Sequence, residues 1–216
     1  RLRLFEFNGS TDNNIVWDGP GTHNFTPFKD LNPNCPPEAK YKALGLASGS
    51  GGGLLAFQSP DGIHWSLIQE TPVITEGAFD SQNLAFWDGV AKCYRAFWRI
   101  FKNGFRDIRT ATSKDFVHWE PWKDLDYGAS PVEHLYTNAI LPYERAPHIL
   151  LGFPTRFLPE TQQVEPTFMV SRDGIRWRRW LDAIIPLDAP QDRDGNRSNY
   201  MTWGMVRLPQ NPSEYS

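Results

Sequence analysis

Three acidic side chains stand at comparable places along the chain, each eleven to fifteen residues before a strand-like run. Asp30, Asp80 and Glu133 precede runs that begin at Tyr41, Tyr94 and His148. Glycoside cleavage needs one carboxylic acid to protonate the leaving oxygen and one carboxylate to attack the sugar or activate water. Burying like charges together is costly, so a purely structural role explains such a cluster poorly. The trio predicts a hydrolytic site, with ordinary turn chemistry of acidic residues as the simpler alternative.

A repeated motif indicates which elements would position these acids. The pattern S-x-D-[GF]-[IV]-[HR]-W occurs at residues 59–65, 113–119 and 171–177, at spacings of 54 and 58 residues. Ser and Asp side chains accept hydrogen bonds from nearby backbone N–H groups and so fix a tight turn. Gly62 and Gly174 supply a positive φ, and Phe116 replaces them in the second copy, which predicts a slightly different turn there.

Strand-like runs surround each copy of the motif, with about four short strands per repeat, as in a propeller blade. They cover 25–29, 40–47, 53–58 and 64–68, then 82–87, 92–99, 106–112 and 118–122, then 136–142, 148–155, 167–170 and 176–180. We therefore expect an all-β fold, a β-propeller of four-stranded antiparallel blades. Residues 1–216 are expected to form a single domain, with blades at approximately 24–70, 79–124 and 132–182 and a partial blade at 192–216.

The number of blades bears on assembly. The chain holds about three complete blades and part of another, which begins with a strand-like run at 199–207. Closed propellers typically have about 4–8 blades, and an open end leaves an unpaired sheet edge. We expect either a chain that is part of a five-bladed ring or a homo-oligomer that completes the ring.

Composition narrows the classes of partner. A net charge of −3 over 216 residues argues against a nucleic-acid-binding face. No stretch approaches the roughly 20 apolar residues of a membrane span, so no membrane partner is expected. Nine Trp and 14 Phe supply either packed cores or the flat walls on which sugar rings stack. A secreted, a periplasmic and a cytoplasmic location all remain open.

Around the three acids the chain resembles the five-bladed propeller glycoside hydrolases, most readily family 32 and also family 43. The segment 29–33 resembles the N-D-P-N-G segment of that group, 79–88 resembles F-R-D-P-K-V-F-W, and 133–138 resembles E-C-P-D-L-F. The resemblance implies Asp30 as nucleophile or base, Asp80 as transition-state stabiliser and Glu133 as general acid. It also implies a furanoside or a related glycan as the substrate.

Eight further residues on or near the predicted inner strands are candidate sugar contacts. They are His23, Trp87, Arg99, His134, Tyr136, Asn138, Arg156 and Trp203. Stacking platforms and hydroxyl partners come from such residues, although ordinary propeller packing explains each of them about as well. His134 beside Glu133 would tune the acid or bind a metal. No cofactor is expected apart from the calcium ion that related propellers often hold in the channel.

Two other classes of function stay open. A non-catalytic carbohydrate-binding or scaffold propeller fits an incomplete ring, and sugar binding without turnover would support it. A sialidase-like enzyme fits the hairpin motif, which resembles the Asp-box S-x-D-x-G-x-x-W but is one residue shorter. Sialidases also need three arginines around the sugar carboxylate, and no such trio is evident from the sequence.

Overall fold

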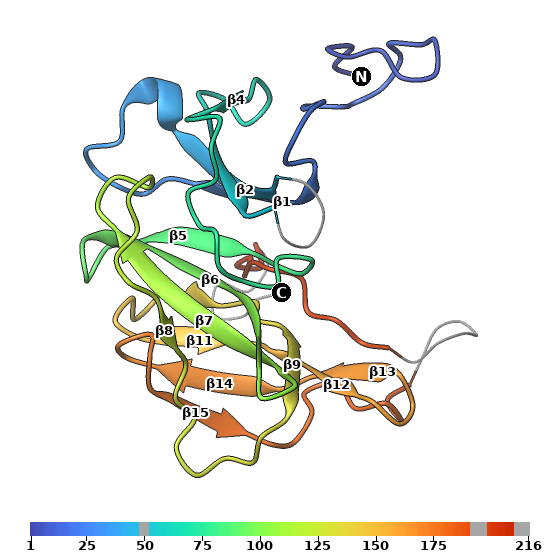
Figure 1. Cartoon of the computed structure of the whole chain (residues 1–216), viewed down its shortest axis with the longest axis vertical. Helices are drawn as coiled ribbons and strands as arrows, with labels where there is room; N and C mark the ends of the chain where they lie inside the picture. The colour runs from blue at the N-terminus through green and yellow to red at the C-terminus, as the bar shows by residue number, and fades with distance from the viewer. Residues whose placement is uncertain (48–51, 191–197, 210–216) are drawn as a thin grey trace.

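The computed structural model describes residues 1–47, 52–190 and 198–209, and its regular structure in them is almost all short antiparallel strands (Figure 1). The first blade has the order β1-β2-β3-β4 and the second β5-β6-β7-β8. Their strands are β1 (His23–Lys29), β2 (Tyr41–Leu46), β3 (Leu54–Ser59), β4 (Ser66–Leu67), β5 (Leu84–Asp88), β6 (Cys93–Lys102), β7 (Phe105–Ser113) and β8 (Lys123–Asp124). The predicted β-propeller of four-stranded antiparallel blades is confirmed.

The third blade is one four-stranded unit whose first three strands are each broken in the middle. Its strands are β9 (His134–Thr137), β10 (Leu141–Pro142), β11 (Leu150–Gly152), β12 (Thr155–Leu158), β13 (Gln163–Pro166), β14 (Phe168–Ser171) and β15 (Trp177–Trp180). They pair as β10-β11-β14-β15 and, beyond the break, as β13-β12-β9. Pro154 and Pro166 lie at the break, and a proline has no N–H to give to a strand ladder. The β12–β13 hairpin consequently projects from the blade, as the orange ribbon of Figure 1 shows.

Apolar side chains fill the spaces between successive blades. Leu44 and Leu54 of the first blade pack with Ala96 and Trp98 of the second in one buried cluster. A second cluster joins the second and third blades through residues that include Phe97 of β6. Because each sheet needs an apolar cover on its buried face, the neighbouring blade supplies the burial that a single blade lacks.

The S-x-D motif builds the same turn in all three blades. The hydroxyl oxygens of Ser59, Ser113 and Ser171 each accept the N–H three residues later at 2.9 Å. Each Asp that follows accepts two further backbone N–H bonds through Oδ1. These bonds favour the ionised carboxylate and hold the pKa of all three Asp side chains well below the usual range.

The prediction that Phe116 changes its turn is wrong. Its φ of 71° is close to the 80° of Gly62 and the 75° of Gly174 at the same place in the other copies. The phenyl ring is fully buried and packs edge-on against Phe28 and Tyr94. The packing energy of a buried phenyl ring, about 3–5 kcal/mol, outweighs the roughly 1–2 kcal/mol cost of a left-handed residue.

The described residues cover only part of the predicted partial blade, 192–216. Residues 192–197 and 210–216 lie outside the described part of the chain, and residues 198–209 contain no strand of two or more residues. The segment instead returns along the second and third blades, where Trp203 donates a hydrogen bond from Nε1 to the carbonyl oxygen of Ile140 at 2.8 Å. Trp203 packs against both inter-blade clusters.

Helical structure is scarce in the described residues. A single turn of 3-10 helix, Pro37–Ala39, lies in the connection from β1 to β2. No helical segment within the described ranges is long and apolar enough for a membrane span.

Replacing Phe116 by Gly is expected to lower the free energy of unfolding by about 3 kcal/mol, because the lost core packing exceeds the relieved backbone strain. Urea unfolding measures this. Gly62→Ala is the matched control, since a Cβ there meets only the Tyr41 ring at an ordinary 3.7 Å and should cost about 1 kcal/mol. A Phe116→Gly protein as stable as the wild type would contradict this account.

Candidate functional site

The three inner strands give the structure two distinct ends. At one end, which we call the mouth, His23 at the start of β1 bonds through Nε2 to Asp80 Oδ1 at 2.9 Å, and Asp80 lies just before β5. At the other end, which we call the base, Tyr94 donates a hydrogen bond to Asp30, which follows the end of β1. The residues before β1 and β5 therefore meet at the mouth, and those after them meet at the base.

The sequence predicts that the three acids converge, but the structure places Asp30 at the base, Asp80 at the mouth and Glu133 in a separate cavity. The seven residues of β1 separate Asp30 from the mouth by about 20 Å of strand. Its repeat counterpart is Asp88, because Tyr41 opposite Ser59 corresponds to Tyr94 opposite Ser113 in strand register. Asp88 follows β5 as Asp30 follows β1, and it pairs with Arg95 at 3.3 Å. The number of residues to the next strand-like run matched Asp30 with Asp80, because that number does not show at which end of the inner strand each residue lies.

Asp30 has a closed environment at the base. Its side chain is 0% exposed and accepts hydrogen bonds from Lys42 Nζ at 2.5 Å, Tyr94 Oη at 2.6 Å and the N–H of Asn32 at 2.8 Å. Burial and the bond to Asp30 raise the pKa of Tyr94 to about 12. Burial lowers the pKa of Lys42, but Asp30 outweighs this and raises it above the usual value. The Lys42–Asp30 ion pair lies within the first blade, and the hydrogen bond from Tyr94 of β6 ties Asp30 to the second blade.

Asp80 has an open environment at the mouth. Its side chain is 60% exposed and borders a cavity of about 440 Å³. The hydrogen bond from His23 and the positive charge of Arg99 lower its pKa. The cavity is lined by Asn24, Phe25, Thr26, Asp80, Ser81, Gln82, Tyr136, Thr137 and Tyr200. Asp80 therefore presents an ionised acceptor to whatever enters the mouth.

The loop that carries Asp80 is fastened to the third blade. Ser81 donates a hydrogen bond to the carbonyl oxygen of Tyr136 at 2.6 Å. Gln82 Oε1 accepts the N–H groups of Asn138 and Ala139 at 3.2 and 2.6 Å, and Asn138 Nδ2 donates to the carbonyl oxygen of Gln82 at 3.1 Å. Asn138 is buried and serves this junction, which fixes the position of Asp80 relative to Tyr136.

Two tyrosine rings line the mouth cavity together with Asp80, and guanidinium groups lie against one of them. The guanidinium carbons of Arg99 and Arg106 each lie 5.3 Å from the centre of the Tyr136 ring. The ring of Tyr200, which is 51% exposed, lies 6.1 Å from Tyr136 at 69°. A flat ring beside ionised acceptors and cationic donors is the combination that sugars need, with stacking on one face and hydroxyl partners around the edge.

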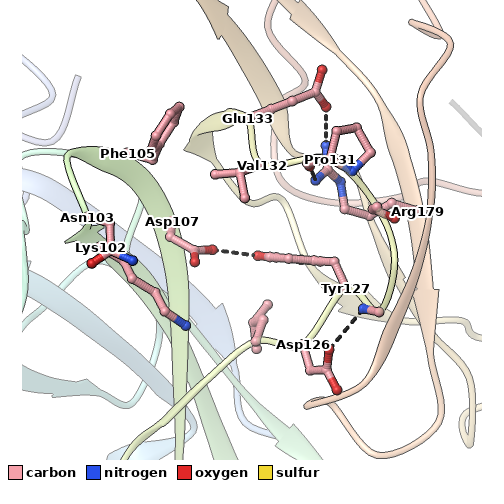
Figure 2. A pocket seen from close by; sticks show the side chains of 13 residues that line it. Lys102, Asn103, Phe105, Asp107, Asp126, Tyr127, Pro131, Val132, Glu133 and Arg179 are labelled. Atoms are coloured by element: carbon pink, nitrogen blue, oxygen red, sulfur yellow. Dashed lines mark hydrogen bonds and ion pairs between the residues drawn. The ribbon is translucent and has the colours of Figure 1, made fainter.

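Glu133 lines a second cavity, between the second and third blades, and its carboxylate is turned toward Arg179 (Figure 2). It immediately precedes β9, and its Oε1 accepts a hydrogen bond from Arg156 at 2.8 Å while its Oε2 is bonded to Arg179. Arg156 is also bonded to Glu165. Both oxygens of Glu133 are thus occupied by guanidinium groups.

Two further predicted sugar contacts, His134 and Trp87, lie in different places. His134 faces the Phe105 ring at 4.8 Å and accepts a hydrogen bond from the N–H of Arg106 at 3.2 Å. Burial and the charge of Arg106 lower the pKa of His134. Trp87 packs on Tyr94 at 5.0 Å, at the base and not at the mouth. Of the eight predicted contacts, His23, Arg99 and Tyr136 gather around Asp80.

Sequence reasoning missed several residues of the mouth and of the second cavity. Asn103 and Gly104, with φ of 51° and 83°, form the two-residue turn between β6 and β7. An Asn-Gly pair between strand-like runs indicates such a hairpin, and it would have placed Arg106 near the mouth. Tyr200 and Gln82 carried no comparable signal, because their positions depend on how distant segments pack.

A metal site finds no support in the described part of the chain. No group of three or more His, Cys, Asp or Glu side chains there could hold a metal ion. We therefore derive no step through the calcium ion that the resemblance implies.

Comparisons with known proteins place this geometry in context. No protein-family model matches the chain, and no curated protein matches it in sequence. Solved structures do match. One is an N-acetylgalactosamine deacetylase from F. plautii in complex with blood group B trisaccharide, with a TM-score of 0.54 and 11% identity over 77% of this chain and 55% of that one. Another is a glycosyl hydrolase from Bacteroides ovatus, with a TM-score of 0.55 and 14% identity over 82% and 54%.

A third match is a protein described as a glycoside hydrolase, with a TM-score of 0.53 and 13% identity over 80% of this chain and 60% of that one. The chain shares its fold with glycoside hydrolases. At these identities the similarity concerns the fold alone. The chain spans little more than half the length of these proteins, so their activities come to it only as proposals.

Asp30→Asn is expected to lower the free energy of unfolding by about 3–5 kcal/mol, because it leaves the buried Lys42 ammonium without its counter-charge. Urea unfolding measures the change, and Asp18→Asn on the exposed surface is the control. A stability equal to that of the wild type would contradict a structural role for Asp30.

Replacing His23 by Phe is expected to raise the pKa of Asp80, because a hydrogen bond to the charged carboxylate is lost. Carboxyl-carbon NMR across a pH titration measures it. His118→Phe is the matched control, since it removes a similar 2.7 Å contact to Asp115 in a hairpin turn and should leave Asp80 unchanged. An unshifted Asp80 in the His23 variant would show that the pair does not set its ionisation.

Proposed function

We propose that the chain is a carbohydrate-active propeller of the glycoside hydrolase type, which binds its glycan at the mouth. The observation that carries this is the arrangement around Asp80, an ionised and exposed carboxylate beside His23, faced by Tyr136 and Tyr200. The shared fold with glycoside hydrolases supports the same conclusion. One of the similar structures holds a trisaccharide, which is in keeping with a sugar ligand.

In this proposal Asp80 contacts the reacting sugar. Its lowered pKa keeps it ionised at neutral pH, which suits an acceptor of sugar hydroxyl hydrogens or a stabiliser of positive charge developing on the ring. Arg99 and Arg106 behind Tyr136 supply donors and hold the tyrosine ring in place. A furanoside or a related glycan remains our proposed substrate class.

Hydrolysis needs a second carboxyl group, and we propose Glu133 for it. Glu133 precedes β9 by one residue, and β9 carries Tyr136 at the mouth. To act as general acid, Glu133 must give up a guanidinium partner, take up a proton and donate that proton to the leaving oxygen. Asp30 is assigned a structural role in this proposal, because its fully buried side chain has no open side for a substrate.

A second candidate function has one observation in its favour. Among the described residues that line the mouth cavity, Asp80 is the only carboxylate. A site with one acid and an aromatic wall binds sugars without cleaving them, as in a non-catalytic carbohydrate-binding propeller.

Asp80→Asn is expected to lower turnover at least about 100-fold, because charge stabilisation at the reacting ring is lost. The assay is release of reducing ends from a panel of furanoside and pyranoside glycans, with circular dichroism to verify folding. Glu133→Gln is expected to lower turnover similarly, and Asp18→Asn is the control.

Wild-type turnover in Asp80→Asn would reject the catalytic assignment. If the wild type binds glycans of the panel but cleaves none of them, the binding function replaces the enzymatic one.

A further inference from the structure

The cavity that contains Glu133 is a second candidate site, distinct from the mouth. It measures about 350 Å³ and lies between the β6–β7 hairpin and the connection that leads from β8 to β9. Figure 2 shows Phe105 and Asp107 on one side of the cavity, Tyr127 bonded to Asp107, and Glu133 bonded to Arg179 on the other side. We call it the inter-blade cleft.

The cleft offers a hydrogen-bond acceptor through Asp107. Asp107 Oδ1 accepts bonds from Tyr127 Oη at 2.9 Å and from the N–H of Ile108 at 2.7 Å. Both of these bonds go to Oδ1, and Asp107 is a half-buried residue that lines the cavity. Burial raises the pKa of this carboxyl group, which makes an added donor from a ligand more valuable.

Donors and a flat ring complete the lining. Arg179, with a side chain that is 1% exposed, is bonded to Glu133 and to the carbonyl oxygen of Pro131, so it holds this side of the lining in place. Lys102 lines the cleft with a side chain that is 47% exposed. Phe105 is 37% exposed at the rim, so one face of its ring is available for stacking. Such a mixture of acceptors, donors and an aromatic face suits a hydroxyl-rich neutral ligand.

Strand β9 connects the cleft with the mouth. Glu133, just before β9, lines the cleft, whereas Tyr136 and Thr137 line the mouth cavity. Three strand residues cover about 10 Å. His134 lies between them and contacts Phe105 of the cleft rim at 4.8 Å. A ligand of several linked units held at the mouth therefore has a second polar and aromatic cavity about 10 Å away along β9.

We propose that the inter-blade cleft binds sugar residues next to the one held at the mouth, so that the ligand is an oligosaccharide and not a single sugar. This inference rests on the proposed function, since it takes the mouth as the primary sugar site. Asp107 accepts a hydroxyl hydrogen of the neighbouring residue, and Phe105 stacks on its ring.

The experiment follows methyl groups of the labelled protein by NMR while sugars are added. The probes are methyl glycosides and the matching trisaccharides of arabinofuranose, fructofuranose, xylose, galactose and N-acetylgalactosamine. Thr26 reports on the mouth, Val132 reports on the cleft, and Val90, an exposed residue in neither cavity, is the reference. We expect a trisaccharide to shift Thr26 and Val132, and the matching methyl glycoside to shift Thr26 alone.

Two variants test the cleft directly. Asp107→Asn and Phe105→Ala should each weaken trisaccharide binding about tenfold while leaving methyl glycoside binding unchanged. Phe7→Ala, another exposed phenylalanine outside both cavities, is the control. Phe105 lies at a partly exposed hairpin position, so its replacement keeps the test valid if Asp107→Asn folds poorly.

The outcomes separate the two proposals. If trisaccharides shift Thr26 but never Val132, or if the cleft variants weaken both sugars equally, the cleft inference is overturned and the mouth remains. If no sugar of the panel shifts Thr26, the proposed function fails, and an effect on Val132 alone would also overturn the extension from the mouth.

Discussion

The direction of the inner strands is the constraint on which the rest of the molecule depends. A blade of four antiparallel strands, joined by short connections, brings each new inner strand in from the same end of the sheet. Residues just before β1 and β5 are therefore neighbours at the mouth, and residues just after them are neighbours at the base. The His23–Asp80 and Tyr94–Asp30 contacts are the two observable consequences. A side chain moved from one end of an inner strand to the other leaves one chemical environment and enters another.

The base and the mouth give a carboxylate opposite environments, one buried and one exposed to water. At the base, Asp30 is withdrawn from water, and its charge is balanced by one lysine and two further donors. Such a pair costs desolvation energy, and removing either partner leaves an uncompensated buried charge. At the mouth, Asp80 keeps most of its hydration and needs only His23 and the more distant Arg99. A carboxylate that remains exposed can exchange water for a ligand hydroxyl at little cost, and one that is enclosed cannot.

Local patterns predicted the blades well, because their causes are local. The S-x-D turn depends on hydrogen bonds within four residues, so its three copies located three hairpins and the spacing of the repeats. The pairing register of neighbouring strands was harder to predict from the sequence. In the third blade, Leu150 and not His148 lies opposite the motif serine, Ser171. The breaks near Pro154 and Pro166 in the same blade were likewise not predicted from the periodic pattern.

Tertiary packing decided the features that sequence reasoning missed. Phe116 holds a glycine-like φ because its ring fills a space between two blades, and that space is set by residues from both. The mouth contains Tyr200 because a segment distant in sequence returns across the third blade. Asp30 illustrates the same point. Its residue type and its spacing in the sequence suggested a site, but like Asp88 it lies at the end of its inner strand that faces the base.

The path of the chain at β9 bears on whether one chain can supply both carboxyl groups of a hydrolase. The pairing of β9 with β12 shifts register at Tyr136, so simple alternation of side chains does not describe this strand. Tyr136 lines the mouth while Glu133 lines the cleft. Glu133 stands before the first paired residue of the strand, however, and the ladder does not fix its backbone. Retaining and inverting glycosidases place their carboxyl groups roughly 5 to 10 Å apart, so under the proposed function Glu133 would turn around the start of β9 toward Asp80. The two arginines that now hold it set the energy of that turn, and an oligosaccharide occupying both cavities would compete with them for the same oxygens.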